Sequence, residues 1–279
     1  MHRFDFIAML LSPVSWFVFA FGALFGSFFN VCIYRIPREI FWKKSRSHCP
    51  ACDAPIPSWH NVPILSWLFL RGKAACCGTR ISVQYPLVEL GTAVLWVIIY
   101  WSFPFFAGSD GSIVFDSAEL LRFAHALIFA SVLLICSVID LEHQIIPDVL
   151  SLPMIALAPV VALFHPELDM KSCLIGIFLG GGLFYAVAWI YFLVRKEYGL
   201  GLGDVKLLAA IGGWLGYQAV LTTIFWASML GSIIGISAIL ISRKKKDLKL
   251  KLPFGPFLSL AAIVLLLFGR YLSDYVITF

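Results

Sequence analysis

Long apolar stretches, separated by short polar segments, run along most of this chain. A helix needs about 20 apolar residues to cross a membrane. A membrane β-barrel would instead show strands of about ten residues with alternating polarity, and no such pattern is present. The pattern therefore predicts an all-α polytopic membrane helix bundle of about eight transmembrane helices. The expected helices lie near residues 13–34, 85–106, 118–139, 149–165, 172–194, 203–216, 218–242 and 253–272.

The composition agrees with a membrane protein and excludes a water-soluble globule. The 279 residues are 61% apolar and only 13% charged, and the mean hydropathy is +0.92. Soluble domains are about half apolar and about a quarter charged. The N-terminal segment contains Asp5 and lacks a short apolar core that ends in a small-residue cleavage site. We therefore expect the first apolar run to stay as a membrane anchor.

The placement of Lys and Arg predicts the orientation. Of the 21 basic residues, 17 lie in or beside four segments, 35–84, 140–148, 195–204 and 243–251. Because basic loops stay in the cytosol, these segments are expected there, with both termini outside. We accordingly expect a first transmembrane segment at 1–34, a small cytosolic domain at 35–84 and a transmembrane core at 85–279.

One stretch is too short for two full crossings. Residues 205–242 must leave the cytosol and return, and as helix they cover about 57 Å at about 1.5 Å per residue. Two crossings need about 60 Å. We therefore expect the helix near 203–216 to be short or to begin below the membrane surface, which draws Asp204 and Lys206 into the membrane edge.

Two aspartates are the main candidates for catalysis. Asp140 ends one apolar helix, and Asp204 stands in the sequence Gly201-Leu202-Gly203-Asp204 at the cytosolic end of another. Ionisable residues at membrane depth usually mark function. Two facing carboxyl groups share a proton, so one can take a proton from water while the other polarises a peptide carbonyl. Each aspartate alone could be a solvated helix-end residue, with Asp204 as an N-cap, but the pair favours an aspartyl protease.

The residues around this pair have several interpretations. Gly199, Gly201 and Gly203 allow a close backbone approach or a positive φ. The same glycines could form an ordinary loop, but a phosphate-binding loop would need a preceding strand. Lys206 belongs to the same expected active-site loop. Asp148 follows Pro147 at an expected helix start, which favours a structural role over catalysis. Glu142 and His143 are expected to be solvated, with substrate binding as the alternative.

Four cysteines of the 35–84 domain form a candidate zinc site: Cys49, Cys52, Cys76 and Cys77. Cytosolic thiols remain reduced, so disulfides are not expected. Cys49 and Cys52 have zinc-knuckle spacing, but the second pair is adjacent and would share a metal only with backbone strain. His48 is an alternative ligand, and a degenerate knuckle without metal is the alternative interpretation. Cys32, Cys136 and Cys173 are expected to be apolar helix residues.

Several motifs in order resemble those of type IV prepilin peptidases, and the resemblance covers most of the chain. The motifs are Gly26-Ser27-Phe28-Phe29-Asn30-Val31-Cys32-Ile33-Tyr34-Arg35-Ile36-Pro37, Cys49-Pro50-Ala51-Cys52, Asn61-Val62-Pro63-Ile64-Leu65-Ser66-Trp67-Leu68, Arg71-Gly72-Lys73, Tyr85-Pro86-Leu87-Val88-Glu89, Asp140 to Asp148, and Gly201-Leu202-Gly203-Asp204-Val205-Lys206.

The resemblance implies a bifunctional enzyme of the bacterial inner membrane that serves type IV pili or type II secretion. Such enzymes cut the leader of prepilins and pseudopilins after a glycine on the cytosolic face, and then methylate the new N-terminus with S-adenosylmethionine. The family's catalytic aspartates match Asp140 and Asp204. The expected partners are these substrates and membrane lipid, with no nucleic acid. The sequence does not locate the cofactor site.

The zinc motif departs from the family pattern, and other function classes compete with the peptidase. The first position of the family's second Cys-x-x-Cys falls on Ala74, which leaves Cys76 as the substitute ligand.

A transporter would need inverted repeats or acids at the bilayer midplane, and neither is present. A methyltransferase with an idle protease centre conflicts with the presence of both aspartates. An archaeal-type preflagellin peptidase conflicts with the cysteine module.

Overall fold

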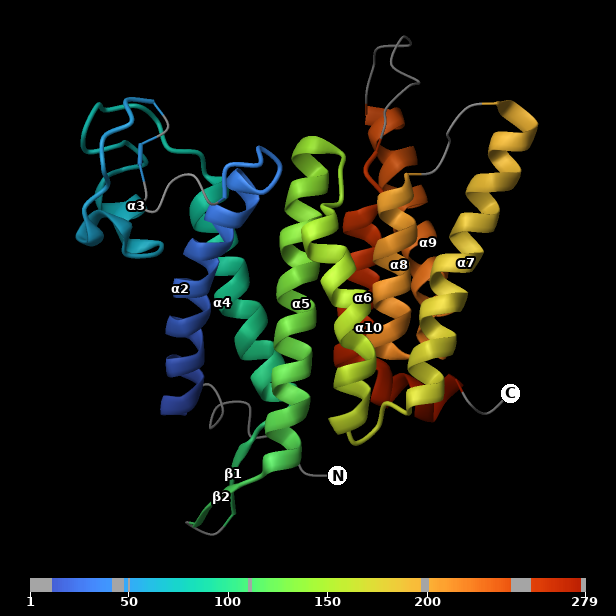
Figure 1. Cartoon of the computed structure of the whole chain (residues 1–279). Helices are drawn as coiled ribbons and strands as arrows, with labels where there is room; N and C mark the ends of the chain where they lie inside the picture. The colour runs from blue at the N-terminus through green and yellow to red at the C-terminus, as the bar shows by residue number, and fades with distance from the viewer. Residues whose placement is uncertain are drawn as a thin grey trace. The chain divides into compact units, whose positions relative to one another are not determined.

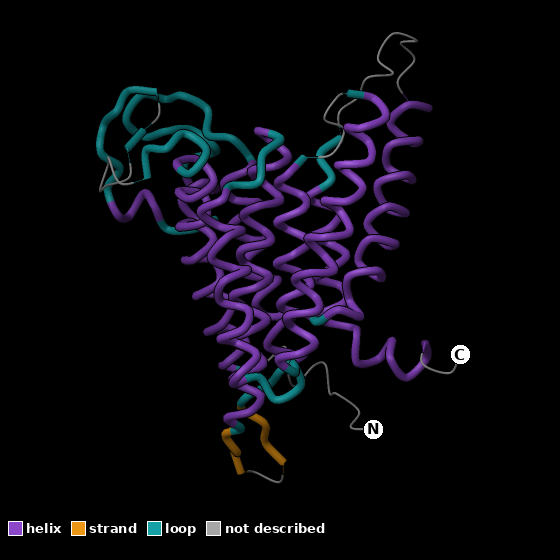
Figure 2. Tube along the Cα trace, turned by 45° about the vertical axis from the view of Figure 1, so that its right-hand side comes forward, coloured by secondary structure: helices purple, strands orange, loops and turns teal. Residues whose placement is uncertain are grey.

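The computed structural model describes residues 12–41, 48–49, 51–109, 112–196, 201–241 and 252–276, with side chains left out at 107–113 and 270–276. The described chain is mainly helical, with one short β-hairpin and with most of its described loop residues between 36 and 83 (Figures 1 and 2). Its elements are α2 (Pro13–Arg35), the 3₁₀ turn η1 (Ser58–Asn61), α3 (Leu65–Phe69), α4 (Gln84–Ser102), β1 (Phe106–Ser109), β2 (Ser112–Phe115), α5 (Ser117–His143), α6 (Asp148–Phe164), α7 (Met170–Arg195), α8 (Leu202–Leu215), α9 (Tyr217–Ile241) and α10 (Gly255–Val276).

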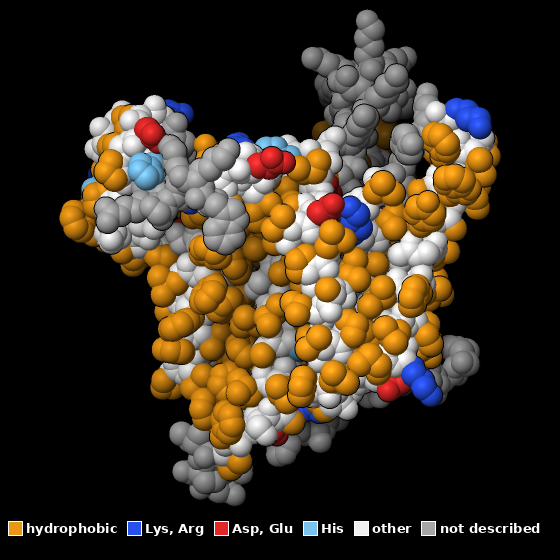
Figure 3. Space-filling view, in the orientation of Figure 1, with side chains coloured by type: hydrophobic (Ala, Val, Ile, Leu, Met, Phe, Trp, Pro, Cys, Tyr) orange, Lys and Arg blue, Asp and Glu red, His pale blue; other side chains and the backbone are white. Residues whose placement is uncertain are grey.

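The predicted all-α membrane class is confirmed. A helix stands at each of the eight expected positions. Five of these helices, α2, α4, α5, α7 and α9, are long and apolar enough to cross a membrane. The helix α8 has 14 residues, so the expectation of a short helix after residue 202 is confirmed. Hydrophobic side chains cover the flanks of the helices, as lipid contact requires (Figure 3).

The chain divides into two compact units, Met1–Phe123 and Ala124–Phe279. In the first unit, α2 and α4 pack closely because α2 has glycines at the contact. A Cβ built on Gly22 would lie 2.7 Å from Ala93 Cα, and one on Gly26 would lie 2.7 Å from Glu89 Cα. The antiparallel hairpin β1–β2 pairs Phe106 with Phe115 and leads into α5.

Side-chain hydrogen bonds join α2 to α4, stabilise the irregular segment between them, and attach that segment to α4. Asn30 Nδ2 donates to the carbonyl oxygen of Tyr85 over 3.0 Å, and Trp67 Nε1 donates to that of Ile81 over 3.3 Å. The buried carboxylate of Glu89 accepts the N–H of Ile64 at 2.7 Å. Since Ile64 has a φ of 62°, Glu89 stabilises a backbone conformation that a β-branched residue rarely adopts.

The second unit is built around α8, which contacts α6, α7, α9 and α10. Nine of its 14 residues are buried. At its C-terminal end, the indole Nε1 of Trp214 donates to the carbonyl oxygen of Met154 at 2.8 Å. His125 Nε2 lies 3.1 Å from the Trp214 carbonyl oxygen, and the His125 ring stacks on the Trp214 ring. By contrast, α9 buries only Val220, Thr223 and Ala227.

Small residues let α7 and α8 touch along their backbones. A Cβ on Gly176 would overlap the carbonyl oxygen of Gly212, and one on Gly180 would overlap that of Leu208. Glycines spaced by four residues are typical of close helix pairs in membranes, where contact depends on van der Waals packing. This contact therefore decides how deeply α8 is held inside the unit.

We expect Gly176→Ala to destabilise the protein by about 1–3 kcal/mol, because the added methyl group must push α7 and α8 apart. Thermal unfolding of the purified protein in detergent measures the effect. Gly182→Ala is the matched control on the same helix, since a Cβ there meets no atom within 4 Å. If Gly176→Ala unfolds at the same temperature as Gly182→Ala and wild type, the close helix contact is wrong.

Candidate functional site

Asp140 lies in the last turn of α5 at one end of the second unit. Its side chain is almost fully buried, with 5% exposure. The carboxyl oxygen Oδ2 accepts a hydrogen bond from the backbone N–H of Gly255, at 3.0 Å, where α10 begins. After α5, Gln144 takes a φ of 54°, and this turn leads the chain directly back toward α6. Asp140 is therefore held between two helix ends inside the unit.

Asp204 lies in the first turn of α8, at the same end of the second unit (Figure 1). The N-cap of α8 is Gly201, and no side chain caps this helix end, so the N-cap interpretation of Asp204 is wrong. The Asp204 and Asp140 carboxyl groups are close enough to interact electrostatically. The structure thus brings together the two aspartates that the sequence selects, from positions 64 residues apart.

The glycines before Asp204 serve close packing. Gly203 faces Ile146, because a Cβ on Gly203 would lie 3.0 Å from Ile146 Cβ. A positive φ is found at neither Gly201 nor Gly203, and Gly199 lies outside the described residues. Of the two roles considered for the glycines, close approach is the one that the described chain shows. The buried side chain of Ile146 sits where a larger residue at position 203 would have to be.

A salt bridge joins the starts of α6 and α8. Lys206 Nζ lies 2.6 Å from Asp148 Oδ1, and both side chains are partly exposed. Asp148 is the first residue of α6, directly after the N-cap Pro147, so this contact agrees with the structural role predicted for it. Glu142 and His143 are exposed and lie 3.7 Å apart, as expected for solvated residues.

The arrangement of the two carboxyl groups suits acid–base chemistry on a neutral substrate. Neighbouring carboxyl groups in a poorly solvated site favour a state with one shared proton, which supplies a base and an acid together. The sequence reasoning missed Ile146 and Gly255, which line the pair. The sequence contains a signal for a helix start at Gly255. This residue is followed by Pro256 at the start of an apolar run, and proline favours the first turn of a helix.

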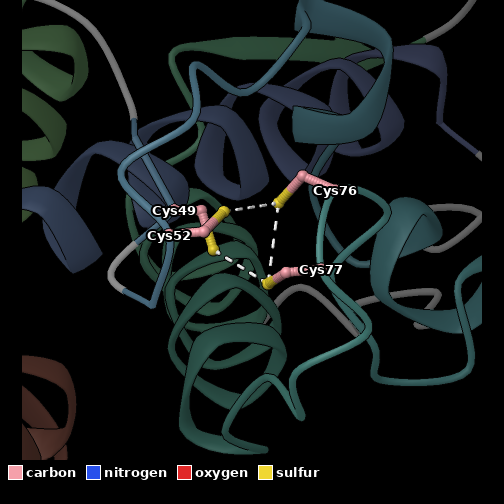
Figure 4. Close-up of side chains that lie close together, drawn as sticks. All are labelled: Cys49, Cys52, Cys76 and Cys77. Carbon is pink, nitrogen blue, oxygen red and sulfur yellow. Dashed lines mark hydrogen bonds between the residues drawn. The ribbon is translucent and has the colours of Figure 1, made fainter.

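The four cysteines of the first unit form a separate cluster. The Sγ atoms of Cys49, Cys52, Cys76 and Cys77 all lie within 4.8 Å of one another. Figure 4 shows the four side chains converging from two loop segments. The sulfur atoms are 3.4 Å apart for Cys52 and Cys76, 3.7 Å for Cys49 and Cys77, and 3.8 Å for Cys76 and Cys77. Among the described residues, the candidate metal ligands in this cluster are the four cysteines, and His48 is not one of them.

The first loop is a tight turn with two backbone hydrogen bonds. The N–H of Cys49 donates to the carbonyl oxygen of Ala54 at 2.9 Å, and the N–H of Asp53 donates to that of Cys49 at 2.8 Å. Asp53 has a φ of 55°, which asparagine and aspartate tolerate better than most residues. The turn places the thiols of Cys49 and Cys52 on the same side (Figure 4).

The second loop repeats this turn with one thiol moved. The N–H of Ala74 donates to the carbonyl oxygen of Thr79 at 2.8 Å, and the N–H of Gly78 donates to that of Ala74 at 2.8 Å. Gly78 has a φ of 71°. Ala74 thus takes the place of the first cysteine, Cys77 takes that of the second, and Cys76 occupies the position between. Neither cysteine has a positive φ, so the expected backbone strain of an adjacent pair is not found there.

The thiols of the second loop differ in their acidity. Hydrogen bonding with the Thr79 hydroxyl, whose oxygen lies 3.2 Å from Cys77 Sγ, and with the Thr79 backbone lowers the pKa of Cys77 to about 6. Contacts with the sulfur atoms of Cys52 and Cys49 raise the pKa of Cys76 to about 12. Within the second loop, Cys77 is therefore the thiol that more readily becomes a thiolate, which is the form that binds metal.

Comparison with known proteins agrees with both parts of the chain. Residues 20–103 match the bacterial peptidase A24 N-terminal domain, and residues 127–236 match the type IV leader peptidase family. No solved structure matches the chain.

Curated relatives cover nearly the whole chain. The prepilin leader peptidase/N-methyltransferase of Stutzerimonas stutzeri is 33% identical over 90% of this chain and 90% of its own length. The protein of the same name from Xanthomonas campestris is 34% identical over 91% of each chain. That from Pseudomonas aeruginosa is 33% identical over 90% of this chain and 89% of its own. The chain therefore belongs to the type IV leader peptidase family.

Proposed function

We propose that this protein is a prepilin leader peptidase and N-methyltransferase of the bacterial inner membrane. It cuts the leader of prepilins or pseudopilins after a glycine on the cytosolic face, and then methylates the new N-terminus. The pairing of Asp140 with Asp204 at one end of the helical unit is the observation that carries the proposal. The names of the curated relatives supply the substrate class and the second activity.

The two aspartates carry out hydrolysis without a covalent intermediate. One carboxylate takes a proton from water as the water oxygen bonds to the scissile carbonyl carbon, and the other carboxyl group gives its proton to the carbonyl oxygen. The resulting diol then collapses. The C–N bond breaks, the leaving nitrogen takes the proton from the first carboxyl group, and a hydroxyl proton returns to the second. Both groups end in their starting states, and one water has been added across the bond.

The distribution of charge supports a cytosolic site. Arg195 ends α7 at the aspartate end of the second unit, whereas Lys171 lies in the first turn of α7 at the other end. Lys206 is also at the aspartate end. This placement agrees with the bias of Lys and Arg toward cytosolic loops, and a leader that stays in the cytosol would meet the pair there.

The cysteine cluster fits a structural zinc ion. Zinc bound to four thiolates has Zn–S bonds of about 2.3 Å in a tetrahedron, which places the sulfur atoms about 3.8 Å apart. Three of the six sulfur–sulfur separations, at 3.4, 3.7 and 3.8 Å, are close to this spacing, and all six are within 4.8 Å. Cys49, Cys52, Cys76 and Cys77 would hold the ion and join the two loops. We propose that 35–84 is a zinc-binding module between the membrane segment 1–34 and the peptidase core 85–279.

The methyltransferase activity rests on the relatives' names. S-adenosylmethionine, when bound, would supply the methyl group for the amine that proteolysis frees. We assign no residue of the described chain to this cofactor.

We expect Asp140→Asn and Asp204→Asn each to lower cleavage about 10²- to 10⁴-fold, because each removes one proton-transfer group. The assay uses the full-length protein in membranes with a prepilin-like substrate, and mass spectrometry reads the product N-terminus. One added methyl group on that product reports the second activity. Asp169→Asn is the matched control, an exposed aspartate at the N-cap of α7, and it should cut normally. Wild-type cleavage by both site variants would rule out the two-aspartate mechanism.

We expect the purified protein to contain zinc, and Cys76→Ser to lose most of it because one of four ligands is removed. Metal content is measured by elemental mass spectrometry. In the Cys76→Ser background, Ala74→Cys should restore the ion by placing a thiol at the vacant turn position. Cys32→Ala, a buried cysteine in α2, is the control and should keep its metal. Full zinc content in Cys76→Ser would show that Cys76 is not a ligand.

A further inference from the structure

The start of α10 faces the Asp140 carboxyl group. The N–H of Gly255, the first residue of α10, donates to Asp140 Oδ2 over 3.0 Å in a buried contact. The N-terminus of a helix carries partial positive charge and unpaired N–H groups, so it stabilises a nearby anion. This contact is long-range in sequence and joins the last helix of the chain to the candidate catalytic pair.

In the described first turn of α10, Gly255 is the one residue whose N–H donates to a group outside this helix end. The next residue is Pro256, which has no N–H. The N–H groups of Phe257 and Leu258 both donate to the carbonyl oxygen of Phe254, at 3.1 and 3.2 Å. The first turn of α10 therefore closes on itself except at one donor, and that donor is bound by Asp140.

The contact requires glycine at this position. A Cβ built on Gly255 would lie 2.6 Å from Asp140 Oδ2 and 3.2 Å from Ile146 Cδ1. Carbon and oxygen atoms cannot approach to 2.6 Å without a shift, and the carboxyl group is the part that can swing away. The backbone of α10 thus approaches Asp140 as closely as sterics allow, and Gly255 positions the carboxylate by both its N–H and its lack of a side chain.

The two aspartates differ in the hydrogen bonds that their carboxyl groups accept. Within the described chain, the Asp204 carboxyl group accepts no hydrogen bond, whereas Asp140 accepts the one from Gly255. Among the described residues, the titratable groups that interact with Asp140 are Asp204 on α8 and Cys136 one turn earlier on α5. Neither group brings positive charge to Asp140. Among the described residues, the N–H of Gly255 is therefore the one donor that makes the surroundings of the two carboxyl groups different.

We infer that Gly255 is a positioning residue whose backbone N–H selects Asp140 as the ionised member of the pair, leaving the proton on Asp204. This assignment rests on the proposed peptidase function. Asp140 takes the proton of the attacking water, and Asp204 gives its proton to the scissile carbonyl oxygen. When the diol collapses, Asp140 passes its proton to the leaving nitrogen and Asp204 recovers one from the diol hydroxyl.

The test compares Gly255→Ala with Gly269→Ala in the full-length protein. A Cβ on Gly269 in the same helix meets no atom within 4 Å, so this variant should match wild type. We expect Gly255→Ala to lower kcat about 10- to 100-fold, the range for a hydrogen bond to a charged group, with KM little changed. The acid limb of its kcat–pH profile should move to higher pH, because a displaced N–H no longer favours the ionised Asp140.

Purely structural damage would lower the amount of folded enzyme and leave the pH profile in place. A Gly255→Ala enzyme with the wild-type rate and profile, beside inactive Asp140→Asn and Asp204→Asn, would overturn this inference while the peptidase function stands. Wild-type activity in both asparagine variants would instead reject the function.

A second comparison decides the assignment if Gly255→Ala does not fold. Asparagine resembles a protonated carboxyl group and can still donate to a carbonyl oxygen. Asp204→Asn should therefore keep more residual cleavage than Asp140→Asn, which loses the base. The reverse order would overturn the assignment of the proton to Asp204.

Discussion

The burial of α8 among its neighbours is the constraint on which the arrangement of the second unit depends. A helix of 14 residues covers about 21 Å, which is less than the hydrocarbon thickness of about 30 Å. Such a helix cannot hold both ends in water, and its backbone must be covered by protein on several sides. The glycine contact between Gly176 and Gly212 makes this possible, because it removes the side-chain layer that usually separates two helices. The consequence is that the first turn of α8, which carries Asp204, lies inside the unit.

The candidate site then forms from parts that are distant in sequence. Asp140 comes from the end of α5, Asp204 from the start of α8, and the N–H of Gly255 from the start of α10. Ile146 fills the space beside Gly203 and Gly255. In this surrounding a carboxylate has few partners, so each hydrogen bond changes the balance between its two protonation states more than it would in water.

The cysteine module differs from the candidate active site, because contacts between residues close in sequence set the geometry of each loop. Each of its two loops is set by a pair of backbone hydrogen bonds and one residue with positive φ, Asp53 in one and Gly78 in the other. The backbone turn is the same although the thiol positions differ. The thiol of Cys76 joins the cluster from the middle of the turn, and its Sγ lies within 4.8 Å of the other three sulfur atoms.

The sequence by itself determined the fold class and the approximate place of every long helix, because these depend on apolar length. It singled out the two aspartates as catalytic candidates, because charge is costly in a membrane. It also selected the four cysteines and anticipated the short helix at α8. Only the tertiary structure decided the contacts that rest on close approach between distant segments. The pairing of Gly255 with Asp140 and of Ile146 with Gly203 leaves no periodic signal, because a glycine or an isoleucine in an apolar run looks the same whether it faces lipid, a neighbouring helix or a carboxylate.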